Sequence, residues 1–396
     1  MIKKAKIFFT IIFTSVLLSG CNNTEEFSIS SYCDYSLTNT LSENSDDMPV
    51  DTSTIYDIKS KYFIKKLNQN LLASFIELYN AVTEFKESVD FKYPIKTDEF
   101  NTLMFLLNYD CPELIQMSEN YFPTYSNQKQ TAVSSVELRY CMNKEDYIQA
   151  KKEIDIFMSE LKKNVSEKSD SEKEKYIYDY ILKKCKYNDT YEFSGSAYGI
   201  LIKNKGRCEA ICKAFMWCMR ELNVECISVS GSQNWDMKSI YSDHSWNIIK
   251  INGEYYHLDI TVDNLMQNNS EKIPPCYGFF NVDDNSINQN RKINTVFTSL
   301  GVPECTSLKE NYHIINKLYV GDMTDIKSKV YNILKNNVKK SSDNISIKFK
   351  NKADYEQATK NIDKWINEFC DKNKYNKFTY KKYYNPLSHT IVIQYN

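Results

Sequence analysis

Apolar residues recur every three or four positions along several parts of the chain, which is the spacing of one helix face. This pattern predicts helices within residues 62–85, 95–111, 146–161, 171–185, 208–222 and 353–369. Short runs of β-branched and aromatic residues predict strands at residues 136–141, 224–230, 244–250, 254–261, 345–349 and 380–384. The Asn252-Gly253 pair between two of these strands is a strong signal for a tight β-hairpin.

Two segments of the chain resemble each other, and each follows a predicted strand and opens a predicted helix. Aligned without gaps, they share Asn143/Asn351, Lys144/Lys352, Asp146/Asp354, Tyr147/Tyr355, Gln149/Gln357, Ala150/Ala358, Ile154/Ile362 and Asp155/Asp363. Two copies are too few for a solenoid, which needs three or more repeats. We therefore expect two similar strand-loop-helix units, with the shared positions serving helix capping and core packing.

The first residues have the pattern of an export signal. Three lysines within residues 3–6 precede an apolar run at residues 7–18, which is too short to cross a bilayer. The run ends in Leu18-Ser19-Gly20-Cys21, which resembles a bacterial lipobox and implies a lipid anchor on Cys21 at the outer face of the cell membrane. The alternative is an ordinary secretory signal peptide. Residues 22–55 are polar and are expected to form a disordered tether.

Composition excludes some functions and leaves others open. Lys+Arg 50 against Asp+Glu 51 provide no excess positive charge for a phosphate backbone, so nucleic acid is not an expected partner. Only four residues are arginine and 30 are tyrosine, which fits an AT-rich genome. We expect a signal peptide at 1–20, a tether at 21–55, an accessory α/β region at 56–165, a central domain at 166–305 and a C-terminal α/β domain at 306–396.

One set of residues combines the groups needed for nucleophilic catalysis. Cys208 begins a predicted helix, where unpaired backbone N–H groups and the helix dipole stabilise a thiolate. A two-residue turn at Asn252-Gly253 pairs residues whose numbers sum to 505, which makes His244 and Asp259 diagonal neighbours on one face. A thiolate, an imidazole and a carboxylate that orients the imidazole can perform acyl transfer. The alternative for Cys208 is a small buried core residue.

These residues also lie in blocks that resemble the bacterial transglutaminase-like superfamily, as found in low-GC Firmicutes. The blocks are Ser196-Ala197-Tyr198-Gly199, Gly206-x-Cys208-Glu209-Ala210, His244-Ser245-Trp246-Asn247 and Tyr255-Tyr256-His257-Leu258-Asp259-Ile260-Thr261. The resemblance implies a papain-like α+β fold, with the cysteine on a helix packed against an antiparallel sheet that bears the histidine and aspartate. It implies Cys208 as nucleophile, His244 as general base and acid, and Asp259 as the residue that orients His244.

The expected activity is that of a surface-anchored thiol enzyme, a transglutaminase-like acyltransferase or a cysteine peptidase or amidase. It would act on protein or peptide amides, some of them cell-wall associated, through an acyl thioester and without a metal or organic cofactor. The Tyr198 hydroxyl and the Cys208 N–H are the candidate oxyanion donors. The alternative is a non-catalytic binding or scaffolding lipoprotein that keeps the fold.

The sequence departs from the family pattern at two positions and carries further cysteines and histidines. Cys111 stands where relatives have His, and Val262 stands where relatives commonly carry Trp, which puts the shape of the substrate groove in doubt. Cys212, one helical turn after Cys208, is expected to pack in the core, with a metal pair or a disulfide as alternatives. For His257 we expect a structural role or a place in the groove wall.

Overall fold

The structure is a computed structural model, and it describes residues 61–234, 242–267, 273–321, 325–338, 343–375 and 378–395. The chain divides into two compact units, Met1–Asp47 and Met48–Asn396, and every described residue belongs to the second. The expected signal peptide, the Cys21 expected to carry a lipid and the tether expected at 21–55 lie outside the described residues. Within the described part, no helix is both long enough and apolar enough to cross a bilayer.

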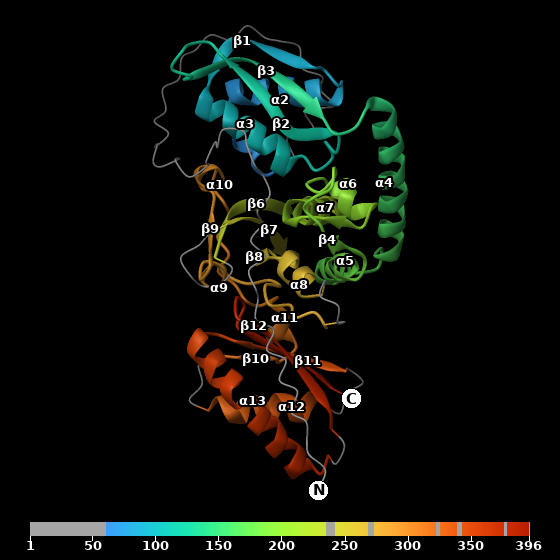
Figure 1. Ribbon diagram of the computed structural model, residues 1–396, viewed down its shortest axis with the longest axis vertical. Coiled ribbons are helices and arrows are strands. Elements are labelled where there is room, and N and C mark those ends of the chain that lie inside the picture. The colour runs from blue at the N-terminus through green and yellow to red at the C-terminus, as the bar shows by residue number, and fades with distance from the viewer. Residues whose placement is uncertain are drawn as a thin grey trace. The chain divides into compact units, whose positions relative to one another are not determined.

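The first part of the described chain packs two helices on one face of a three-stranded antiparallel sheet (Figure 1). In chain order its elements are η2 (Ile64–Lys66), α2 (Gln69–Thr83), β1 (Ser88–Lys96), α3 (Thr97–Asp110), β2 (Met117–Tyr125) and β3 (Ala132–Tyr140). The strands lie in the order β1-β3-β2. Phe100 and Leu103 of α3 and Val136 of β3 are fully buried in the core between the layers.

The central part packs a helical layer on a four-stranded antiparallel sheet. Its elements are α4 (Lys144–Asn164), α5 (Asp170–Lys184), β4 (Lys186–Tyr187), α6 (Ala197–Leu201), β5 (Lys205–Gly206), α7 (Cys208–Glu221), β6 (Cys226–Gln233), β7 (Ser242–Ile251), β8 (Glu254–Leu258), α8 (Ile260–Gln267), α9 (Asp284–Ile287), β9 (Arg291–Ile293) and α10 (Thr295–Ser299). The strand order is β8-β7-β6-β9, and α7 packs on β6 and β7. The expected α+β arrangement, with the cysteine-bearing helix on the histidine-bearing sheet, is confirmed.

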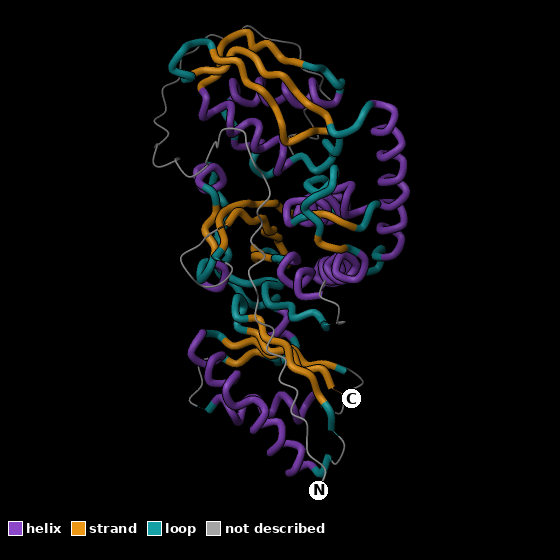
Figure 2. The backbone as a smooth tube through the Cα atoms, viewed as in Figure 1, coloured by secondary structure: helices purple, strands orange, loops and turns teal. Residues whose placement is uncertain are grey.

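The last part of the chain packs helices on a four-stranded sheet. Its elements are α11 (Tyr312–Ile315), β10 (Tyr319–Val320), α12 (Ile326–Asn337), β11 (Asn344–Phe349), α13 (Lys352–Asn373), β12 (Tyr380–Asn385) and β13 (Thr390–Tyr395). The sheet order is β10-β11-β13-β12, and helices α12 and α13 cover one face of it (Figure 2). Ile347, Ile362 and Ile391 are fully buried between these layers.

The internal repeat serves capping and packing, as expected. The Asn143 side chain accepts a hydrogen bond from the Asp146 N–H at the start of α4, and Asn351 accepts from the Asp354 N–H at the start of α13, each at 2.9 Å. The shared alanines and isoleucines are buried in both copies: Ala150, Ile154, Ala358 and Ile362. The two helices have different partners, because α4 packs on α6 and α7 whereas α13 packs on α12 and β11.

Two expected boundaries are wrong. The strand expected at 254–261 ends at Leu258, and Ile260 already begins α8. The reason is local, because the Asp259 carboxylate accepts a hydrogen bond from the Thr261 N–H at 3.0 Å and so caps the new helix. The long helix expected at 62–85 begins only at Gln69, where the Asn68 side chain caps the Leu71 N–H.

Candidate active site

Cys208 is the first residue of α7, and the cap residue before it contributes no side-chain hydrogen bond. The backbone N–H groups of the first turn of α7 therefore donate no hydrogen bond to the side chain of the N-cap residue. This end of a helix favours negative charge, including that of a thiolate. The side chain is partly exposed.

His244 connects the cysteine to the aspartate. It lies on β7 opposite Gly231 of β6, and its ring is 2% exposed. Its Nε2 lies 2.8 Å from Asp259 Oδ2, and its ring also interacts with the Cys208 side chain. Because Nε2 is engaged by Asp259, Nδ1 is the nitrogen left for the thiol. Burial would lower the pKa of His244, but Asp259 and Cys208 outweigh it and raise the pKa to about 9.

The hairpin places these groups as the sequence arithmetic predicts. The residue numbers of each pair between β7 and β8 sum to 505, from Asn247 with Leu258 to Ile251 with Glu254. Asp259 follows directly after β8, so its side chain lies beside His244. The structure thus brings together Cys208, His244 and Asp259.

Asp259 is held by three donors while being 1% exposed. Its Oδ2 accepts from His244 Nε2 and from Arg291 Nη2, the latter at 2.6 Å, and its Oδ1 accepts from the Thr261 N–H. Burial alone would raise the pKa of Asp259, but His244 and Arg291 lower it to about 2. The carboxylate is therefore ionised and fixed in orientation. Arg291 was not predicted from the sequence.

A second histidine supports the first through a tryptophan. The Trp246 ring stacks on His244 at 6.1 Å between centroids, and its Nε1–H donates to His257 Nδ1 at 3.1 Å. His257 Nε2 lies 2.8 Å from Asp284 Oδ1. Because Nδ1 accepts from Trp246, the ring proton of a neutral His257 is on Nε2 and donates to Asp284. Burial lowers the pKa of His257, which fits this neutral form.

His257, Asp284 and Cys305 form a group whose potential ligand atoms lie within 4.8 Å of one another. The hydrogen bonds argue against a metal there. Coordination by Nε2 of His257 would require the ring proton to be on Nδ1, where the Trp246 N–H already points. Asp284 is also engaged, since its Oδ2 accepts from the Cys305 N–H at 2.9 Å. The group is better described as support for the Trp246 side of the site.

The candidate oxyanion donor Tyr198 is directed elsewhere. Its hydroxyl donates to Glu153 of α4 at 3.0 Å, and Lys203 lies over its ring. Tyr187, which the sequence analysis did not identify, lies at the cysteine instead. It pairs with Gly206 in the short parallel ladder of β4 and β5, and its hydroxyl is within hydrogen-bonding reach of the Cys208 backbone N–H. Burial raises the pKa of Tyr187, so its hydroxyl keeps a proton that it can donate.

The remaining sequence candidates are core residues or wall residues. Cys212 is free and 2% exposed, and the other cysteines within the described residues are free as well. Its expected role in core packing is confirmed. Val262, where relatives commonly carry Trp, is 4% exposed on α8 and packs in the core.

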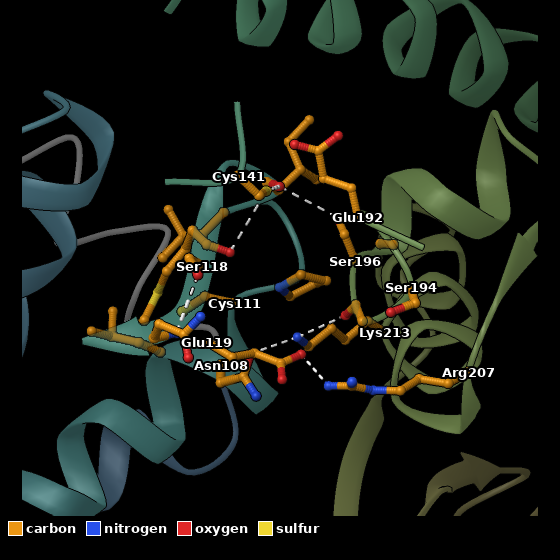
Figure 3. Close-up of a pocket in the computed structure, with 18 residues that line it drawn as sticks. Asn108, Cys111, Ser118, Glu119, Cys141, Glu192, Ser194, Ser196, Arg207 and Lys213 are labelled. Atoms are coloured by element: carbon orange, nitrogen blue, oxygen red, sulfur yellow. Dashed lines mark hydrogen bonds and ion pairs between the residues drawn. The ribbon is translucent and has the colours of Figure 1, made fainter. Parts of the chain in front are cut away.

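Residues of the accessory region contact side chains that precede and follow Cys208 in the chain. Glu119 of β2 pairs with Arg207, and Asn108 of α3 donates to Glu209 at 2.7 Å and accepts from Lys213 at 2.6 Å. A polar cavity of about 180 Å³ lies between these elements, and Figure 3 shows the Asn108 and Glu119 side facing the Arg207 and Lys213 side. The Tyr109 hydroxyl lies within hydrogen-bonding reach of two serines, Ser230 and Ser245.

Comparison with known proteins agrees with this geometry for the central part of the chain. Residues 159–260 match the family model of the Transglutaminase-like superfamily. None of the curated proteins matches the chain in sequence.

Solved structures share partial likeness with the chain. A protein from Cytophaga hutchinsonii, provisionally named a cysteine protease, is 17% identical over 27% of this chain and 37% of its own, with a TM-score of 0.23. A structure named a TGase is 13% identical over 47% of this chain and 53% of its own, with a TM-score of 0.26. A provisionally named protease from Parabacteroides distasonis is 12% identical over 36% and 31%, with a TM-score of 0.22. The chain thus spans about half or less of each. Residues 159–260, which carry Cys208, His244 and Asp259, form a transglutaminase-like core.

Proposed function

We propose that this protein is a thiol enzyme of the transglutaminase-like type, which acylates Cys208 with a protein or peptide amide and passes the acyl group to an amine or to water. One observation carries the proposal. The buried His244 ring hydrogen-bonds the ionised Asp259 carboxylate and interacts with the Cys208 thiol at a helix N-terminus. This arrangement has every group that nucleophilic acyl transfer needs.

The first half of the reaction forms a thioester. Because the pKa of His244 is raised, the thiol proton moves to His244 and leaves a thiolate beside an imidazolium. The Cys208 Sγ attacks the amide carbonyl carbon, and the carbonyl oxygen becomes an oxyanion. The Cys208 N–H and the Tyr187 hydroxyl are the two donors placed next to the attacking atom. The C–N bond then breaks, and the leaving amine takes the proton from His244.

The second half reverses these proton transfers. His244, now neutral, removes a proton from an incoming amine or water molecule, which attacks the thioester carbonyl. Collapse of the second oxyanion breaks the C–S bond and returns the proton from His244 to the Cys208 thiolate. An amine acceptor gives a cross-linked product, and water gives hydrolysis. Asp259 stays ionised throughout and holds the imidazole in the required orientation.

We propose that the enzyme works outside the cell, tethered by a lipid on Cys21 to the outer face of the membrane. The support is the Leu18-Ser19-Gly20-Cys21 sequence behind an apolar run and the polar segment that follows it. In that location the substrates would be proteins or peptides of the surface or cell wall. Nucleic acid is not proposed as a partner, because the net charge of -1 gives no excess positive charge.

The test is to offer the fragment of residues 56–396 a glutamine-containing protein together with a labelled primary amine. Incorporation of the amine shows acyl transfer, and shortened products or glutamines converted to glutamate show hydrolysis. The Cys208→Ala variant is the control and should give neither. If the wild-type fragment gives neither product and does not differ from Cys208→Ala, the proposed activity is wrong.

A further inference from the structure

A fully buried arginine reaches the catalytic carboxylate from outside the matched family segment. Arg291 is the first residue of β9, which pairs antiparallel with β6 through Gln233 opposite Arg291. Its side chain is 0% exposed, and its Nη2 lies 2.6 Å from Asp259 Oδ2. Only four residues of the chain are arginine, against 46 lysines, so an arginine at this point is unusual for the composition.

The rest of the guanidinium is fixed by the core. Its Nη1 donates to Asn290 Oδ1 at 2.6 Å. The guanidinium carbon lies 4.0 Å from the centroid of the Phe279 ring and 5.9 Å from that of Trp246, the residue that stacks on His244. A planar guanidinium suits such stacking and such forked hydrogen bonding, whereas a lysine ammonium does not.

Arg291 and His244 share one oxygen of the Asp259 carboxylate, which links the arginine to the proposed catalytic residues. Asp259 Oδ2 accepts from both Arg291 and His244, while Oδ1 accepts from the Thr261 N–H. With each carboxylate oxygen held, the Asp259 side chain has no freedom to rotate away from His244. A buried carboxylate with His244 as its sole cationic partner would be costly to keep ionised.

We propose that Arg291 is a positioning residue for acyl transfer, which acts through Asp259 to hold His244 in line with Cys208. The inference rests on the proposed function, because it assigns a role in that same reaction. Groups that orient a metal-bound histidine through a hydrogen bond commonly contribute about 10- to 100-fold to activity, and we expect a similar magnitude for a group that orients His244 through Asp259.

The experiment measures the nucleophilicity of Cys208 and does not need the natural substrate. The rate of iodoacetamide alkylation at pH 7 is followed for the Cys208 peptide by mass spectrometry, in wild type, Arg291→Met and Arg291→Lys. We expect alkylation to slow about 10-fold or more in Arg291→Met and to recover in part in Arg291→Lys, which keeps the charge but loses the fork. Circular dichroism establishes that each variant is folded.

Arg220 provides the matched control. It pairs with a buried aspartate, Asp110, and also donates to the Cys226 carbonyl, apart from the catalytic residues. Arg220→Met and Arg220→Lys should lower the unfolding midpoint as the Arg291 variants do, with alkylation of Cys208 within about twofold of wild type. If Arg291→Met does not fold, Arg291→Lys against Arg220→Lys decides the question.

The outcomes separate this inference from the proposed function. If His244→Ala alkylates at Cys208 as fast as wild type, the proposed thiol activity fails. If His244→Ala is slow but the folded Arg291 variants react like wild type or like their Arg220 counterparts, the role assigned to Arg291 is wrong.

Discussion

At the scale of single residues, the charge on His244 is the property on which the chemistry depends. Asp259 and Cys208 outweigh burial and raise the pKa of His244 to about 9, whereas an unfolded histidine titrates near 6.5. Folding therefore favours proton uptake by His244. The stability that this uptake contributes is complete below about pH 6.5 and is lost as the pH rises toward 9.

This loss of stability with rising pH can be measured by urea denaturation at several pH values. In a Cys208→Ser background, which removes the thiol proton from the balance, we expect the free energy of unfolding with His244 to fall by about 1 to 2 kcal/mol, relative to His244→Gln, between pH 6 and 9.5. His257→Gln is the control, because burial lowers the pKa of His257 and its effect should be constant above about pH 6.5. Parallel curves for the two His244 proteins would contradict the raised pKa.

The oxyanion donor gives a second test at this scale. The Tyr187 hydroxyl lies at the Cys208 N–H, whereas the Tyr198 hydroxyl donates to Glu153. Tyr187→Phe should lower the rate of acyl-enzyme formation about 100-fold, and Tyr198→Phe should leave it near wild type. Single-turnover kinetics with an activated acyl substrate measure this rate. Equal effects of the two substitutions would exclude Tyr187 as the donor.

The residues that the sequence predicted differ in kind from those it missed. His244 lies on one strand of a hairpin and Asp259 directly follows the other, so a two-residue turn fixed their register by counting. Arg291 reaches Asp259 from a strand 32 residues later, after loops that carry no periodic pattern. Tyr187 reaches Cys208 through a parallel ladder only two residues long. Such short contacts between distant segments leave no periodic signal in the sequence.

At the scale of elements, helix ends show both the power and the limits of local signals. The segment Ser171-Glu172-Lys173-Glu174 has the spacing of a capping box, but the box is made two residues earlier by Ser169 and Glu172. Both serines satisfy the same sequence rule, and packing decides between them. Strand β1 was missed because its buried residues do not alternate along its whole length, and β2 was missed because none of its residues is buried. Register shifts interrupt the pairing of both strands with β3.

The repeated asparagine caps allow a prediction at this scale. Asn143→Ala and Asn351→Ala should each lower the free energy of unfolding by about 1 kcal/mol, because each leaves a first-turn N–H without its side-chain acceptor. Urea denaturation measures the change. Asn361→Ala, in the middle of α13, is the control and should change stability by less than about 0.5 kcal/mol. A cap substitution without effect would show that the shared asparagines are not the reason for the repeat.

At the scale of the whole described chain, the accessory region is built into the site. The family model begins at residue 159, yet Asn108, Tyr109 and Glu119 contact the residues around Cys208 from outside it. Burial would raise the pKa of Glu209, but Lys213 and Arg207 lower it, so an ionised Glu209 lies in the first turn of α7. Buried charges of this kind are costly unless their hydrogen bonds are complete.

Asn108 completes that set, because its amide donates to Glu209 Oε1 and accepts from Lys213 Nζ. The remaining Lys213 hydrogen bonds go to Glu209 and to the Gly195 carbonyl. Asn108→Ala should therefore cost about 1 to 3 kcal/mol of stability and slow Cys208 alkylation by loosening the first turn of α7. Thr102→Ala, on an exposed part of the same helix, should change neither by more than the scatter of the measurement. If the two substitutions behave alike, the accessory region lies beside the site without supporting it; if only Asn108→Ala slows alkylation, the working unit extends beyond the family segment.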